Sequence, residues 1–285
     1  VSFWEAKLEC WLDFKKCQFA GEADFRSIHA DQGIVFSHCT FEQDFLLRGG
    51  LVQKKLQADG SRFEGMLDLS KAKLFDYVYL EGIQQGPRMR WAVLNTVGDR
   101  ILVRPEQLEC RLASEVDGRH HDAMQEYGLL KRCYQSMHRF DAEDWAFYRF
   151  KVNQRRSKPC SWRRPWTVWR NAADWLFLDV GCSYGTSPAR ADRMVMIIIL
   201  GFANLYGAFV EMFHVEVIPF GDDPGTLANR MMIGLTTSVS VFTSGMGGIR
   251  DVARGWMNIP VMIESIMGTL LFGLFIVAFS RKVIR

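Results

Sequence analysis

Hydrophobic residues in roughly the first eighty positions recur every 22 residues, a period that fits neither a helix nor a simple alternating strand. A repeat of this length predicts a solenoid, in which each coil has about four faces of roughly five residues. Stacking the coils buries the repeated positions as ladders, so each coil is stable only on its neighbours. The aligned columns are Phe3/Phe25/Leu47/Leu69, Leu8/Ala30/Val52/Leu74, Leu12/Ile34/Leu56/Val78, Phe14/Phe36/Ala58 and Phe19/Phe41/Phe63.

Small residues stand two positions before the central Phe or Leu of many faces. They are Ala6, Cys17, Ala23, Cys39, Ser61 and Ala72. This pattern resembles the pentapeptide-repeat family, and the resemblance implies a right-handed β-helix over residues 1–86. Two interpretations of this domain stay open: a surface for binding or assembly, and a structural spacer.

A helical period replaces the repeat in the following region, and we predict an α-helical linker over residues 87–180. The first apolar stripe contains Met124, Tyr127, Leu130, Tyr134 and Met137. Asp141 is positioned to cap a second helix that carries Trp145, Tyr148, Phe150 and Val152. His120, His121 and Asp122 have metal-ligating side chains, but no distant Cys or His stands at a suitable spacing, so we interpret them as the polar start of a helix.

Charge divides the chain into two unlike parts. Residues 194–285 carry twelve charged side chains in 92 positions, against 55 in the first 193. Residues 194–213 and 256–280 are apolar runs with one charge each, Glu211 and Glu264. About twenty helical residues span the roughly 30 Å of a bilayer core. We therefore predict transmembrane helices over 194–216 and 256–280, in a membrane domain (194–285) preceded by a juxtamembrane elbow (181–193).

Basic residues precede the first apolar run and follow the second. They are Arg190 and Arg193 before the first run, and Arg281, Lys282 and Arg285 after the second. The positive-inside rule therefore predicts that both termini are cytoplasmic. All seven cysteines lie in the polar part, their number is odd and no CxxC pair occurs, which favours reduced thiols.

Tryptophan and basic residues alternate between Arg155 and Arg170, just before the first apolar run. This composition suits the headgroup layer of a membrane with anionic lipid, and a nucleic-acid patch is the rival interpretation. The membrane segment follows directly and the net charge is only +3, so we favour lipid and expect no nucleic acid. The sequence contains no P-loop, GxSxG, HExxH or paired catalytic carboxylates, so we do not expect an enzyme or a cofactor.

The segment between the two apolar runs carries the functional prediction. Residues 227–241 are compatible with a helix, but they are too few and too rich in Ser and Thr to span a membrane. Residues 242–248 then read Phe-Thr-Ser-Gly-Met-Gly-Gly. A Gly-rich, non-helical loop at membrane depth is tolerated where it lines a water-filled path. Its carbonyl groups can turn inward and replace the hydration shell of a cation.

Residues 237–247 resemble the pore helix and T-V-G-Y-G filter of the two-transmembrane potassium-channel family. Residues 184–190, Tyr-Gly-Thr-Ser-Pro-Ala-Arg, resemble the Y-G-T-x-P-x-R elbow of bacterial channels that carry pentapeptide repeats. The resemblance implies a homotetramer in the bacterial inner membrane, with a permeant monovalent cation as its only bound ion. It implies ion-binding filter positions at Thr243, Ser244, Gly245, Met246 and Gly247.

The filter departs from the family at three positions, where Ser244 replaces Val, Met246 replaces Tyr and Gly248 replaces Asp. In the family, the Tyr ring and the Asp help to hold the filter at a fixed width. Methionine is flexible and donates no hydrogen bond. The sequence therefore leaves potassium selectivity and non-selective conduction of K⁺ and Na⁺ both open.

The second apolar run contains the other candidate residues. Glu264 with Gly268 resembles the family's E-x-x-x-G pattern, and we predict that Glu264 lies behind the filter, bonded to Thr236 or Thr237; simple orientation of the run is the alternative. Gly268 and Gly273 are candidate hinges. Candidate gate residues, which could instead face lipid, are Phe272, Ile276 and Phe279.

No arginine ladder typical of a voltage sensor occurs in the sequence. The repeat domain is therefore the candidate regulator, through assembly, gating or an unidentified cytoplasmic partner. A membrane-anchored scaffold, in which the apolar runs serve only as anchors, is the alternative to a channel. An anchor, however, does not require the Gly-rich loop.

Overall fold

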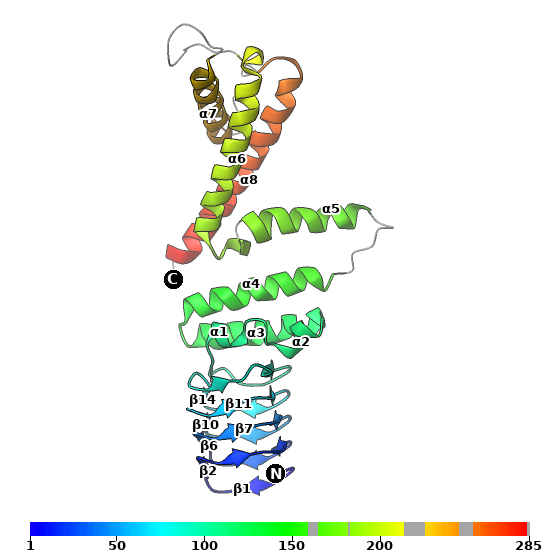
Figure 1. The fold of residues 1–285 in the computed structure, drawn as a ribbon, viewed down its shortest axis with the longest axis vertical. Helices are drawn as coiled ribbons and strands as arrows, with labels where there is room; N and C mark the ends of the chain where they lie inside the picture. The colour runs from blue at the N-terminus through cyan, green and yellow to red at the C-terminus, as the bar shows by residue number, and fades with distance from the viewer. Residues whose placement is uncertain (159–164, 182, 214–225, 245–252, 284–285) are drawn as a thin grey trace. The chain divides into compact units, whose positions relative to one another are not determined.

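The computed structural model describes residues 1–158, 165–181, 183–213, 226–244 and 253–283. The chain forms two compact units, Val1–Cys160 and Ser161–Arg285. The first unit contains a β-solenoid and four helices, and the described part of the second is helical (Figure 1). Each unit is considered by itself below.

The solenoid consists of short strands arranged as four parallel sheets, one on each face. One sheet contains β1 (Lys7–Leu8), β5 (His29–Ala30), β9 (Leu51–Val52) and β13 (Lys73–Leu74). A second contains β2 (Leu12–Lys15), β6 (Ile34–Ser37), β10 (Leu56–Gln57), β14 (Val78–Tyr79) and β17 (Ile101–Leu102). The others contain β3 (Gln18–Phe19), β7 (Thr40–Phe41), β11 (Arg62–Phe63) and β15 (Gln84–Gln85), and β4 (Ala23–Asp24), β8 (Phe45–Leu46), β12 (Met66–Asp68) and β16 (Arg90–Ala92).

Strand register confirms the 22-residue period. Lys7 pairs with His29, and Arg62 pairs with Gln84, each 22 positions away. The last coil is longer, because Leu67 pairs with Trp91 and Val78 pairs with Ile101. The solenoid therefore continues past the predicted boundary at residue 86, to Leu102. The extra residues shift the last coil out of the 22-residue phase that reveals the others.

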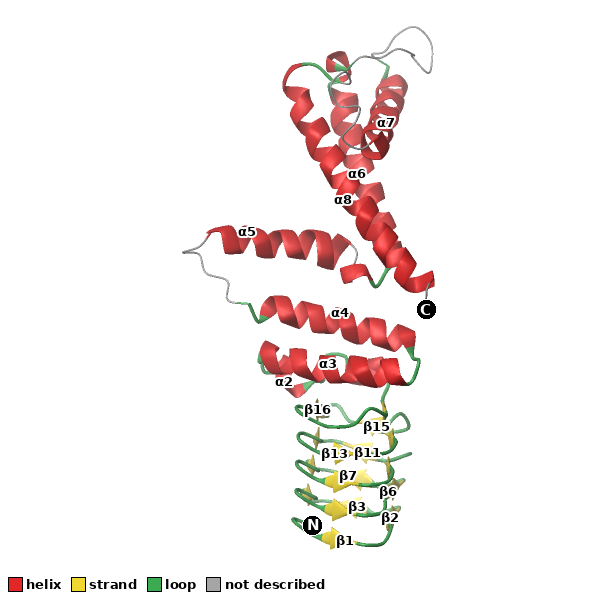
Figure 2. Cartoon of the chain, turned by 180° about the vertical axis from the view of Figure 1, so that it is seen from behind, coloured by secondary structure: helices red, strands yellow, loops and turns green. Residues whose placement is uncertain are grey.

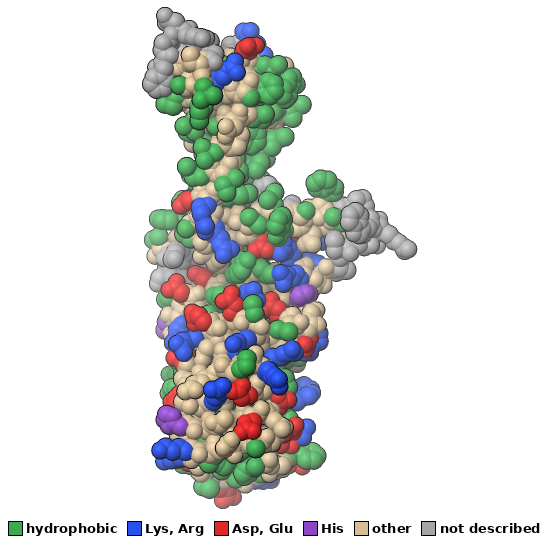
Figure 3. All heavy atoms as spheres, in the orientation of Figure 1, with side chains coloured by type: hydrophobic (Ala, Val, Ile, Leu, Met, Phe, Trp, Pro, Cys, Tyr) green, Lys and Arg blue, Asp and Glu red, His purple; other side chains and the backbone are tan. Residues whose placement is uncertain are grey.

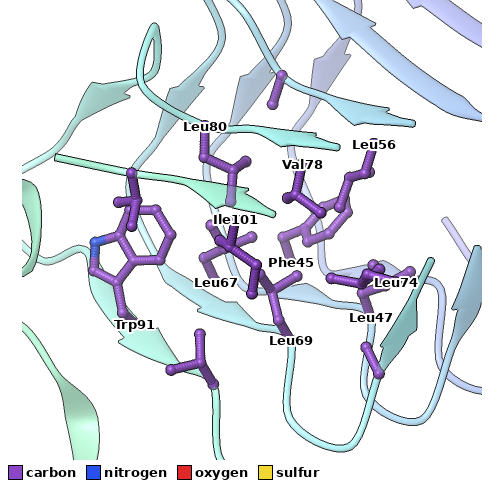
Figure 4. Close-up of a cluster of buried hydrophobic side chains, with 14 of the residues drawn as sticks. Phe45, Leu47, Leu56, Leu67, Leu69, Leu74, Val78, Leu80, Trp91 and Ile101 are labelled. Carbon is purple, nitrogen blue, oxygen red and sulfur yellow. The ribbon is translucent and has the colours of Figure 1, made fainter. Parts of the chain in front are cut away.

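Stacked side chains fill the interior of the solenoid as the columns predict. The centroid of the Phe19 ring lies 4.7 Å from that of Phe41, which lies 4.6 Å from that of Phe63, and the stacked rings are nearly parallel in both pairs. Beyond Phe63 the core becomes aliphatic, with Leu67, Leu69 and Leu80 beside Trp91 (Figure 4). A small residue also links neighbouring coils, because Ser61 Oγ accepts a hydrogen bond from the Cys39 amide, 22 residues earlier, at 3.0 Å. This fold is consistent with a pentapeptide-repeat β-helix.

Helices follow the last coil in the first unit (Figure 2). They are α1 (Pro105–Leu108), α2 (Ala113–Val116), α3 (His120–Ser136) and α4 (Phe140–Arg156). The helix predicted to start near His120 is present, and Tyr134 on its buried face donates a hydrogen bond to Val103 O at 3.0 Å. Asp141, predicted as a cap, instead lies in the first turn of α4, because that helix begins at Phe140 and Arg139 occupies the cap position.

The second unit contains two long apolar helices. Its elements are α5 (Pro165–Ala173), the π-helix η1 (Asp174–Gly181), the short 3₁₀ turns η2 (Ser183–Gly185), η3 (Val210–Met212) and η6 (Gly255–Met257), and the α-helices α6 (Pro188–Ala208), α7 (Leu227–Ser244) and α8 (Asn258–Val283). Residues 188–208 and 255–280 are helices long and apolar enough to cross a membrane, by length and composition. On the face in Figure 3, apolar side chains predominate over this region, whereas charges of both signs cover the solenoid.

The first long helix differs from its predicted bounds of 194–216. It begins at Pro188, and its helical backbone ends at Ala208. Proline favours the first turn of a helix, because its fixed φ suits that position and its missing N–H has no partner there. Hydropathy does not detect this polar first turn, and residues 188–193, which we predicted as part of the elbow, therefore belong to α6.

Candidate functional site: the α7 helix and a buried carboxyl

The α7 helix packs antiparallel against α6 at intervals of four residues. A Cβ atom added to Gly207 would lie 2.7 Å from Arg230 O, and one added to Gly234 would lie 2.2 Å from Ala203 O. One turn later, Ser238 Oγ lies 3.0 Å from Ile199 O. The two glycines therefore permit a backbone approach that no other residue allows.

Two further contacts join α7 to α8. Ser238 Oγ donates a hydrogen bond to Glu264, and a Cβ added to Gly268 would lie 2.6 Å from Phe242 O. Four residues separate the two contacts on each helix, and they follow the same order in both. The α7 and α8 helices therefore run in the same direction at this contact.

These contacts place the two ends of α7 at different levels of the unit. Its first turns lie beside the end of α6, and Phe242 lies beside Gly268, about 15 Å along α8 from Asn258 at 1.5 Å per residue. The next described residues are back at the end of α6, because Ala253 bridges to Phe213 and the Arg254 amide donates to Met212 O at 2.8 Å. The α7 helix thus runs from the level of the end of α6 to the level of Gly268, and the chain is again beside the end of α6 at Ala253, before α8 begins.

Glu264 lies fully buried where α6, α7 and α8 meet. Tyr206, on α6, donates its hydroxyl proton to Glu264 Oε2 at 2.5 Å, and Ser238 donates to Oε1. Among the described residues no basic side chain forms an ion pair with this carboxyl. A carboxyl in such a place depends on hydrogen bonds for its stability, because burial of an unpaired charge is costly.

The predicted partners of Glu264 are wrong by one or two positions. Thr236 donates its hydroxyl to Met232 O at 2.9 Å, on its own helix, and the carboxyl instead contacts Ser238. Successive residues on a helix point about 100° apart, so only one of the neighbouring hydroxyls at 236, 237 and 238 faces α8. Tyr206 was not predicted at all.

The predicted filter overlaps the end of α7. Phe242, Thr243 and Ser244 are helical, contrary to the predicted loop beginning at 242. The Thr243 hydroxyl donates to Val239 O at 2.7 Å, a bond that threonine forms readily within helices. The predicted filter positions Gly245, Met246 and Gly247 lie outside the described residues.

Candidate hinge and gate residues lie on a continuous α8 helix. Gly268 packs directly against the backbone of Phe242, where an added Cβ would lie 2.6 Å from Phe242 O. A Cβ added to Gly273, in contrast, would meet nothing within 4 Å. Phe272, Ile276 and Phe279 are all more than half exposed in the single chain. Their side chains are therefore available to a neighbouring copy, to lipid or to water.

The juxtamembrane segment exposes aromatic side chains. Trp166 and Trp169 on α5 and Trp175 on η1 are each more than half exposed. Trp162, Arg163 and Arg164, which belong to the predicted lipid-contacting segment, lie outside the described residues.

The first unit contains a buried carboxyl that no sequence pattern indicates. Glu126, on α3, accepts hydrogen bonds from the Val93 amide at 2.9 Å and from the Ser114 hydroxyl. It joins the last solenoid coil to α2 and α3. Burial raises the pKa of Glu126 to about 6, although both hydrogen bonds act in the opposite direction. His120 and His121 begin α3, and no three His, Cys, Asp or Glu side chains in the described residues cluster as metal ligands.

This raised pKa predicts a pH-dependent stability. The folded pKa of about 6 exceeds the ordinary value of 4.5, so the folded protein binds this proton more tightly than the unfolded chain. The contribution of Glu126 to the unfolding free energy should therefore increase by roughly 2 kcal/mol as the pH falls from above 6 to below 4.5. Amide hydrogen exchange of the solenoid strands across this range should reveal the increase relative to Glu126→Gln. Parallel profiles for the two proteins would contradict this prediction.

Comparisons of the chain with protein-family models, with curated proteins and with solved structures found no match in any of the three.

Proposed function

We propose that this chain is the pore-forming subunit of a tetrameric cation channel of the potassium-channel type. The observation that supports this proposal is the course of α7, which begins beside the end of α6 and stops part of the way along α8, before the chain returns. A helix that only anchors a protein has no reason to stop there. A short helix that delivers a loop to the middle of a membrane is what an ion path requires.

The end of α7 has the right polarity for a cation. The last four carbonyl groups of a helix have no partner within it, and the helix dipole gives that end a partial negative charge. Thr243 and Ser244 are the last residues of α7. Their carbonyls, together with those of residues 245–247, form the proposed cation-binding stretch.

One chain contributes one such stretch, so a closed ring of carbonyls requires several copies around an axis. We assign four copies by resemblance, in the bacterial inner membrane with both termini in the cytoplasm. The exposed tryptophans of α5 and η1, with the basic residues around them, would contact anionic lipid. The solenoid would then assemble or gate the pore from the cytoplasmic side.

Non-selective conduction of monovalent cations is the second candidate, and three residues favour it. Ser244, Met246 and Gly248 stand where the family has Val, Tyr and Asp. None of them supplies the ring or the charge that would hold the filter at a fixed width. We keep K⁺ as the first candidate because the Thr, both Gly positions and the preceding helix are retained.

Reconstitution into liposomes of defined composition tests both candidates. We expect the purified protein to carry single-channel currents, with a reversal potential under K⁺/Na⁺ bi-ionic conditions that favours K⁺. Equal permeabilities would establish the non-selective alternative, and Met246→Tyr should then increase K⁺ preference. An intact oligomer that passes no cation would overturn the channel proposal and favour a membrane-anchored scaffold.

A further inference from the structure

We propose that Tyr206 is a positioning residue of the pore: it holds the Glu264 carboxyl so that this group, through Ser238, fixes the carbonyl end of α7. The inference rests on the proposed channel function and adds to it a residue on α6 that no filter motif includes. All three side chains are at most 1% exposed. Each belongs to a different helix, so together they connect α6, α7 and α8.

The two carboxyl oxygens of Glu264 are divided between the other helices. Tyr206 donates to Oε2 at 2.5 Å, which leaves Oε1 for Ser238. Without the tyrosine hydroxyl, Oε2 would be a buried acceptor with no partner among the described residues, and the carboxyl could rotate away from α7 to find one. The position of Ser238 therefore depends on an atom that it does not touch.

The Tyr206 ring is held independently of its hydroxyl. It lies 4.8 Å from the ring of Phe213 and 5.8 Å from that of Phe202, and it packs in a buried cluster with Met257 and Val261. These apolar contacts remain if only the oxygen is removed. Tyr206→Phe therefore deletes the proposed positioning contact with little change to the packing.

Ser238 is well placed to transmit this effect. It precedes Ser244 by six residues, about 9 Å along the helix, with the close contact between Phe242 and Gly268 in between. The α7 helix is thus attached to α8 at two points one turn apart. Loosening the first point allows the end of α7, with the carbonyls of Thr243 and Ser244, to shift.

The experiment compares Tyr206→Phe, Ser238→Ala and the double variant with the native protein, reconstituted as full-length chains. Thr236→Ala is the matched control, because it also removes a hydroxyl from α7. The Thr236 hydroxyl hydrogen-bonds only to backbone carbonyls of α7 itself, those of Met232 and Ile233. We expect the K⁺/Na⁺ permeability ratio to fall about fivefold in each single variant, the size of effect that one lost hydrogen bond produces. The double variant should fall no further than Ser238→Ala, because Tyr206 acts on α7 only through Glu264 and Ser238. Glu264→Gln, which keeps one acceptor oxygen and replaces the other with an NH2 donor, should retain more of the ratio than Glu264→Leu.

A second measurement separates this inference from the proposed function. Hydrogen exchange of the amides at residues 242–244 should be about fivefold faster in Tyr206→Phe and Ser238→Ala and unchanged in Thr236→Ala. If the native protein passes no ions, the channel proposal and the pore role of Tyr206 fail together, while this exchange still decides whether Tyr206 positions α7. If the native pore does not distinguish K⁺ from Na⁺, single-channel conductance replaces the ratio. Native-like values in both hydroxyl variants would overturn the inference.

Discussion

Replacing Phe41 with alanine should lower the unfolding free energy of the first unit by about 3–5 kcal/mol, the usual cost of removing a fully buried phenylalanine. The Phe41 ring is completely buried and lies between Phe19 and Phe63 in a stack. Its edges also meet the rings of Phe36 and Phe45. Parallel ladders above and below hold the backbone, so the coils cannot collapse to fill the cavity.

A loss of this size matters because domains are usually stable by only about 5–15 kcal/mol. Chemical unfolding followed by far-ultraviolet circular dichroism measures it. Phe75→Ala is the matched control, because this phenylalanine belongs to the same solenoid but is 58% exposed. We expect the control to change stability by less than about 1 kcal/mol. Equal losses in the two variants would contradict the ladder as the source of stability.

The solenoid was predictable because the same arrangement of apolar residues recurs in each successive coil. Each column contains three or four apolar residues, and stacking the coils buries most of them. The end of the solenoid was not predictable, since the pairing of Leu67 with Trp91 spans 24 residues and therefore lies outside the repeat. The buried position of Glu126 could not be predicted from the sequence, for a different reason. Its partners, Val93 and Ser114, come from segments without a periodic pattern.

In the second unit, the sequence indicated the kinds of group but not their pairing. An isolated carboxyl in an apolar helix requires hydrogen-bond donors, which correctly directed attention to the hydroxyls near Thr237. Only packing decides that Ser238 faces Glu264. A further signal was present in α6, where Tyr206 is the sole tyrosine within Pro188–Ala208. A buried carboxyl has two oxygens and can accept from donors on both neighbouring helices, and Tyr206 is such a donor on α6.

Replacing Gly234 with leucine should cost the second unit more than about 3 kcal/mol and abolish most cation flux, because the new side chain would overlap backbone rather than side-chain atoms. Its Cβ would lie 2.2 Å from Ala203 O and 2.8 Å from the Gly207 amide nitrogen. Neither atom can move without separating α6 from α7. Leucine also favours a helix over glycine by nearly 1 kcal/mol, so any loss of stability arises from packing and not from helix propensity.

Gly201→Leu supplies the comparison, because it is the same substitution on α6 at a position where an added Cβ would meet nothing within 4 Å. Thermal unfolding in detergent should leave this variant near the native midpoint and lower that of Gly234→Leu by many degrees. In liposomes, flux should survive the first change and not the second. If the two variants behaved alike, the close approach of α6 and α7 would not be what holds α7 in place, and the geometry on which the proposed cation path depends would have to be abandoned.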